Sequence, residues 1–150
     1  MNESQLPAFV IGEVVRTTNS AEFDQSTAKI PGLWDRVLSD STLAGWSGRI
    51  GTELFGVYFD YESDESGAYS VLVGVGANSD EDTPAGASSV GLNEVHRVVF
   101  PAEGPMPAGV VEAWGRVWSA SAAGELGRAF TTDIEVHRRD GSVVILIAAG

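Results

Sequence analysis

The sequence contains no cysteine, and this absence excludes disulfide scaffolds, zinc–thiolate sites and cysteine nucleophiles. Basic residues are also few: 9 Lys and Arg stand against 21 Asp and Glu, which gives a net charge of −12. Proteins that follow nucleic-acid phosphates or dock on anionic lipid need a basic face. We therefore expect no direct contact with nucleic acid or membrane, whereas cationic partners are compatible with this charge.

Long hydrophobic runs are missing as well. No segment approaches the ~18 consecutive apolar residues of a membrane span. The segment 1–5 has neither the basic region nor the apolar stretch of a signal peptide, so we expect a cytoplasmic protein. The chain has 150 residues, of which 43% are hydrophobic, and this fits one globular domain with a sizeable core.

Residues that commonly bind metals and cofactors are sparse. The only histidines, His96 and His137, lie in different predicted strands and in no ligand motif, so we predict no metal and no cofactor. The glycines at 74–76 are not followed by a helical pattern, which argues against a dinucleotide loop. The acidic run 60–65 lacks the glycine and the distant Glu of a calcium loop, and a solvated turn explains it better.

The apolar pattern divides the chain into two similar halves, each ordered strand, helix, strand, strand. The first half is predicted to contain a strand over 9–18, a helix over 30–38, and strands over 54–61 and 68–76. The second is predicted to contain a strand over 92–101, a helix around 110–118, and strands over 130–138 and 142–149. Residues 78–87, with three acids, a proline and a glycine, form the boundary between them.

This order predicts an α+β fold of tandem βαββ repeats with pseudo-twofold symmetry, antiparallel sheets and two main helices. The repeats span about 7–77 and 89–150, joined by a linker at about 78–88, in a single domain over 1–150. Such a pairing leaves a cleft at the seam, where small ligands often bind. The segment 127–138 is a candidate free sheet edge for a homodimer.

Five segments, in order along almost the whole chain, resemble the GyrI-like effector-binding domains. Among these, the integron-associated, AraC-type effector-binding proteins are the most similar. The segments are IPGLW at 30–34, GVYFDYESD at 56–64, GAYSVLVG at 67–74, GP at 104–105 with VEAW at 111–114 and Trp118, and FTTDIEV at 130–136. The resemblance implies a tandem βαββ fold with a ligand cleft between its halves.

Two features set this chain apart from that family's usual pattern. In the family's regulators the domain follows a DNA-binding helix-turn-helix, whereas here it begins at about residue 7, so we expect the stand-alone form. Aromatic residues that are frequent in the family are replaced by His137 and by the segment 93–96 (NEVH). Whether His96 and His137 take the place of pocket aromatics is open.

Glu135 is the leading candidate for a binding residue. Strand alternation places Asp133, Glu135 and His137 on one face and Ile134 and Val136 on the other. If the apolar face packs under the helices, Glu135 faces the seam, where a carboxylate among aromatic rings would attract a lipophilic cation. The resemblance implies that the matching Glu recognises cationic ligands. The alternative is a solvated strand face with an acid–histidine pair.

Aromatic residues are candidates for the walls of the same cleft, although each is also a candidate for the core. Tyr58 and Tyr61 have opposite strand parity, so both face the cleft only if a bulge or turn separates them. Trp46 lies in a Gly/Ser loop and is expected to cap the cleft. The full set of candidate ligand-binding residues is Glu135, Tyr58, Tyr61, Trp34, Trp46, Trp114, Trp118 and His137.

Three functions remain open. The first is a small-molecule binding module for a cationic, amphipathic or aromatic compound, of the multidrug-binding kind used in transcription regulation. The second is a hydrolase that detoxifies cyclopropane-bearing DNA alkylators, because some stand-alone members of the family resemble such enzymes. In that case Glu135 or Glu112 would act as the base and Tyr58 as its hydrogen-bonding partner. The third is a protein-interaction modulator such as a gyrase inhibitor. A homodimer or a regulatory protein partner is compatible with the small-molecule binding module.

Overall fold

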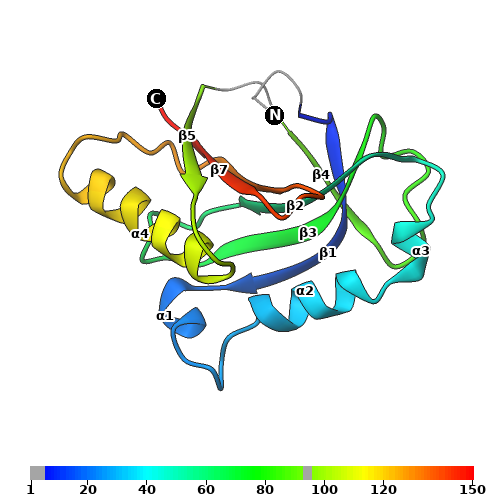
Figure 1. Ribbon diagram of the computed structural model, residues 1–150, viewed down its shortest axis with the longest axis horizontal. Coiled ribbons are helices and arrows are strands. Elements are labelled where there is room, and N and C mark those ends of the chain that lie inside the picture. Colours follow the sequence, from blue (N-terminus) through cyan, green and yellow to red (C-terminus); the bar gives the residue numbers. More distant parts are fainter. Residues whose placement is uncertain (1–5, 93–95) are drawn as a thin grey trace.

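A computed structural model describes residues 6–92 and 96–150 and shows an α+β architecture (Figure 1). The first part of the chain forms β1 (Phe9–Thr17), α1 (Asn19–Glu22), α2 (Ile30–Leu38), α3 (Ser41–Ala44), β2 (Arg49–Phe59), β3 (Tyr69–Ala77) and β4 (Ser88–Gly91). The second forms β5 (Arg97–Ala102), α4 (Ala108–Ala122), β6 (Thr132–His137) and β7 (Val143–Ala148). No helix in the described residues is long and apolar enough to cross a membrane.

The strands of the described residues form one antiparallel sheet in the order β4-β1-β3-β2-β6-β7-β5. The two halves of the chain contribute to it in mirrored order. β2 and β6, each the first strand after a main helix, pair at the centre, with β3 and β7 next and then β1 and β5. The α+β class with antiparallel strands and two main helices is confirmed. The pseudo-twofold relation between the repeats stays a prediction, which this order supports.

The helices α2 and α4 lie against the same face of the sheet (Figure 1). Leu33 and Val37 of α2 join the core residues of β1 and β3, while Ala113 and Val117 of α4 join those of β7. Trp114 packs against both groups, so it lies where the two halves meet. The opposite face carries a separate apolar cluster made of Val10, Phe55, Val57, Leu72, Ile134, Val136, Val144 and Leu146.

This arrangement corrects one premise of the sequence analysis. Ile134 and Val136 were expected to pack under the helices, but they belong to the apolar cluster on the opposite face. The helices therefore cover the face that carries Glu135. The premise was wrong because both faces of β6 are buried, so an apolar face alone does not indicate the side on which a helix lies.

Three other features of the sheet differ from expectation. A strand was expected over 92–101, whereas β5 covers Arg97–Ala102 and residues 93–95 lie outside the described part of the chain. The short strand β4, which was not predicted, pairs with β1. The segment 127–138 does not offer a free edge, because β6 pairs with β2 on one side and with β7 on the other.

Candidate functional site

A cavity of about 920 Å³ lies between α2 and α4, over the central strands of the sheet. Its lining comes from both halves of the chain, with side chains from α2, β2 and β3 on one side and from α4 and β6 on the other. The volume is within the usual range for a site that holds one organic molecule. In the described residues, no group of three or more acidic or histidine side chains is arranged to hold a metal ion.

Glu135 lies in this cavity, although only 3% of its surface is exposed to solvent. The phenol of Tyr58, on the neighbouring strand β2, donates a hydrogen bond to Oε2 at 2.8 Å. The indole Nε1 of Trp114, on α4, donates to the same oxygen at 2.7 Å. The imidazole Nε2 of His137 lies 2.8 Å from Oε1. Because each carboxylate oxygen has two lone-pair positions, these contacts fill Oε2 and leave one position on Oε1.

Glu135 is not balanced by a permanent cation among the described residues. Its ion-pair partner there is His137, which is charged only when protonated. The second buried acid of the same strand, Asp133, is neutralised by the guanidinium of Arg128 at 2.8 Å. Arg128 also lies 4.4 Å from the ring centre of Phe130. Among the described residues, the carboxylate of Glu135 is therefore the buried negative charge of the cavity that has no permanent ion-pair partner.

The tyrosines of the cavity are held as neutral hydrogen-bond donors. Burial raises the pKa of Tyr58 well above its ordinary value, and the charge of Glu135 raises it further. Burial and the charge of Asp133 do the same to the pKa of Tyr61, whose hydroxyl donates to that carboxylate. Tyr61 reaches the cavity because β2 has ended and Asp60 adopts a φ of 53°, which reverses the strand parity. This is the turn that the sequence analysis required for both tyrosines to face one side.

Most of the aromatic candidates come together here. Seven of the eight candidate residues line the cavity: Trp34, Tyr58, Tyr61, Trp114, Trp118, Glu135 and His137. Trp46 is not among its lining residues and instead packs on the core cluster beside Leu43. His96 is exposed and is not part of the lining either. Glu112 is exposed and forms an ion pair with Arg116 at 2.9 Å.

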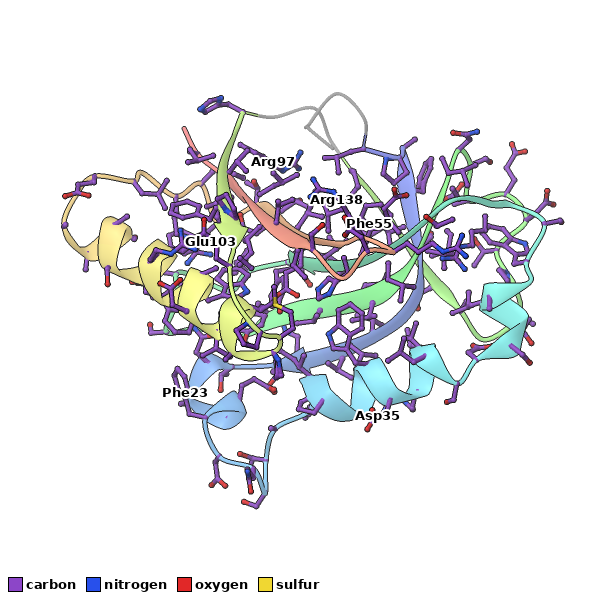
Figure 2. All side chains as sticks on the ribbon, in the orientation of Figure 1. Phe23, Asp35, Phe55, Arg97, Glu103 and Arg138 are labelled. Atoms are coloured by element: carbon purple, nitrogen blue, oxygen red, sulfur yellow. The ribbon has the colours of Figure 1, made fainter. Side chains whose placement is uncertain are left out.

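The apolar rim of the cavity was not predicted from the sequence. Phe23, Leu38 and Val111 are 72%, 65% and 63% exposed, yet all three line it. Phe23 follows α1 and is labelled in Figure 2. Its ring meets that of Trp118 on α4 edge-on, at 5.8 Å between ring centres. An exposed phenylalanine in a polar segment was the available signal for this rim. Arg128 was also missed, because it lies between α4 and β6, where no periodicity predicts its direction.

A cavity shared by two halves of one sheet, with aromatic walls and a buried charge, is the arrangement of a small-molecule binding domain. Comparison with known proteins agrees: a family model described as integron-associated effector binding protein (Cass2) matches residues 4–148. The chain belongs to this family. The GyrI-like effector-binding resemblance found in the sequence is thereby confirmed.

Two solved structures and one curated protein are similar to the chain. An integron cassette protein from the mobile metagenome of Vibrio cholerae has 31% sequence identity and a TM-score of 0.79, over 97% of this chain and 92% of that one. SAV2435, solved with bound tetraphenylphosphonium, has the same fold with 15% identity and a TM-score of 0.73, over 97% of this chain and 90% of its own. YobU of Bacillus subtilis (strain 168), whose name proposes a transcriptional regulator, is 27% identical over 130 residues, covering 85% of this chain and 79% of YobU.

Proposed function

We propose that the cavity binds an amphipathic organic cation, with Glu135 as its counter-charge. The observation that carries this proposal is a carboxylate that is 3% exposed, surrounded by aromatic side chains and, in the described part of the chain, ion-paired only with His137. A buried charge is costly unless it is paired. A cation that enters the cavity offsets this cost, and the faces of the aromatic rings attract it as well.

The shape and lining of the cavity support an aromatic ligand of moderate size. The tryptophans at 34, 114 and 118 offer flat surfaces, and the exposed rim residues Phe23 and Val111 extend the apolar surface to the mouth. Such a lining fixes few hydrogen bonds, so it suits several related compounds rather than one. SAV2435, which shares the fold, was solved with an ion of this kind, tetraphenylphosphonium. A role in transcription regulation is supported by the family and by the name of YobU.

The test is a titration of tryptophan fluorescence with tetraphenylphosphonium and, in parallel, with the neutral compound triphenylphosphine oxide. Glu135→Gln keeps the size of the side chain and removes its charge, so we expect the cation to bind at least about tenfold more weakly while the neutral compound is unaffected. Glu112→Gln is the matched control, because it makes the same change in net charge at an exposed position on α4. Equal cation affinity in wild type and Glu135→Gln would show that Glu135 is not the counter-charge.

A hydrolase remains the second candidate, and one observation favours it. The carboxylate of Glu135 is 2.8 Å from both the phenol of Tyr58 and the imidazole of His137, so groups able to exchange a proton lie together in a cavity that is partly closed to water. Incubation with cyclopropane-bearing alkylators, followed by mass spectrometry, separates the two functions. A binding module returns the compound unchanged, whereas a hydrolase returns it with the elements of water added.

A further inference from the structure

His137 is placed to control the charge that a ligand meets at Glu135. Its Nε2 atom lies 2.8 Å from Oε1 of the carboxylate, and its ring lies 4.4 Å from the ring centre of Trp34. The His137 side chain is 26% exposed, so it can exchange protons with solvent. Imidazole is the side chain whose charge ordinarily changes between pH 5 and 8.

His137 shares the cavity with other charged or titratable side chains, which come from the elements that line it. They are Glu22 at the end of α1, Asp35 on α2, Tyr58 on β2, Tyr61 and Glu65 before β3, Tyr69 on β3, Arg128 before β6, Glu135 on β6 and Arg138 after it. Carboxyl groups ordinarily titrate near pH 4, and arginine stays charged. Burial raises the pKa of all three tyrosines. His137 is thus the lining residue whose side-chain type titrates around neutral pH.

We propose that protonated His137 and a bound cation compete for Glu135, so that the affinity of the cavity for cations falls as the pH is lowered. This inference rests on the proposed function. When His137 is neutral, the pair carries the full negative charge of Glu135. When His137 is protonated, the pair is neutral at a separation of 2.8 Å, and the ligand loses its counter-charge and meets a positive ring.

The lone-pair positions of the carboxylate strengthen this competition. Tyr58 and Trp114 fill both positions on Oε2, so the remaining position is on Oε1, beside His137. A cation that carries a hydrogen-bond donor therefore reaches the carboxylate next to the imidazole, and the charge of His137 acts at close range on any cation held near Glu135. The consequence is a site that holds its ligand at neutral or alkaline pH and releases it on acidification.

The test measures binding of tetraphenylphosphonium from about pH 8 to about pH 5.5, because this ion has no proton to lose and titration of the ligand cannot contribute. If a protonated His137 fully excludes the cation, we expect binding to weaken roughly tenfold across this range, which spans the interval in which imidazole ordinarily changes its charge. His137→Gln keeps an amide donor toward Oε1 without a titrating charge, and His137→Phe keeps a ring beside Trp34 without a proton. Both variants are expected to show a profile that is flat within about twofold.

The outcomes separate the inference from the proposed function. A flat profile in the wild type, or a profile that neither variant changes, overturns the inference, while binding at about pH 8 still supports the cation site. Absence of binding by the wild type at that pH overturns both. Triphenylphosphine oxide, which is neutral, is the control for acid effects on the cavity as a whole. An equal loss of affinity for it on acidification also overturns the inference.

Discussion

At the scale of single residues, the three tyrosines of the chain line one cavity, and the pKa of each is raised. Tyr58 and Tyr61 each donate a hydrogen bond to a buried carboxylate, whereas Tyr69 donates to the side chain of Asn19. Burial is the largest cause of the raised pKa in all three. Ionisation of any of them would add a negative charge to a region that already contains the carboxylates of Glu135 and Asp133.

We therefore predict that the native protein shows almost no tyrosinate absorbance near pH 10, where all three phenols ionise in denaturant. Because the pKa of each is higher in the folded state, the folded protein binds more protons than the unfolded chain above pH 10. The stability that these groups provide is then fully present below about pH 10 and is lost as the pH rises above it. Spectrophotometric titration of native and denatured protein checks this. Ionisation of all three in the native protein near pH 10 would contradict it.

Alternation along one strand placed Glu135 and His137 on one face, because both lie inside β6, where the pattern is regular, and the family resemblance singled out Glu135. Alternation did not identify Arg128, whose position depends on the buried ion pair with Asp133 rather than on any local pattern. Trp46 was expected to cap the cleft because it lies in a loop, but a ring in a loop packs on whichever apolar surface the tertiary fold brings to it. Residues inside regular elements were thus predictable, whereas of the residues in connections Tyr61 was predicted and Arg128 and Trp46 were not.

At the scale of elements, the ladder between β1 and β3 contains an unusually close approach of two backbones. Gly12 and Gly74 are partners in this ladder. A Cβ atom added to Gly12 would lie 1.9 Å from the carbonyl oxygen of Val73 and 2.7 Å from Cα of Gly74. Real Cβ atoms do not approach backbone atoms so closely, so the strands would have to separate.

Gly12→Ala is predicted to destabilise the protein by at least about 3 kcal/mol, the upper part of the range for overpacking, because backbone rather than a mobile side chain must move. Gly115→Ala is the matched control. Gly115 lies inside α4 with no atom near its missing Cβ, and alanine there is expected to stabilise the helix by about 0.5–1 kcal/mol. Urea denaturation of the two variants measures both effects. A loss below about 1 kcal/mol for Gly12→Ala would show that the ladder adapts.

The elements themselves were predicted unevenly. The helix over 30–38 matches α2, because its apolar residues recur at helical spacing over its whole length. α4 extends to Ala122, beyond its apolar stripe, because its last residues are small and show no helical spacing of large apolar side chains. β2 begins at Arg49 rather than near 54, since its register shifts between Ile50 and Leu54 and interrupts the alternation. The pairing of β4 with β1 is non-local, so no local pattern predicts it.

At the scale of the whole molecule, the net charge of −12 reflects an excess of acidic residues, and two kinds of acid among them have different roles. The acids of the segments 60–65 and 80–82 are exposed and belong to turns, where they are solvated. Together they produce a negative field that draws cations toward the protein over distance. Glu135 is different, because it is buried at the cavity between the two halves. We therefore assign the long-range attraction of a cation to the exposed acids of these turns, and its recognition in the cavity to Glu135.

The central pairing of β2 with β6 joins the halves in one sheet, and the cavity takes side chains from both. A ligand held there contacts the helix of each half, so it stabilises the molecule as one unit. We predict a single unfolding transition, whose midpoint rises when tetraphenylphosphonium is added. At about 100 times the dissociation constant, the gain is about 2.7 kcal/mol. For a chain of this length, that corresponds to a rise of about 5–10 °C.

Differential scanning calorimetry with Glu135→Gln as the comparison checks this prediction. At the same ligand concentration the variant binds at least about tenfold more weakly, so its midpoint is expected to rise by at most about half as much as that of the wild type. Glu112→Gln, on the outer side of α4, is expected to respond like the wild type. Two separate transitions, only one of which moves with ligand, would contradict the view that the sheet and the cavity make the halves unfold together. Equal shifts in all three proteins would mean that the ion acts on the general negative charge rather than at Glu135.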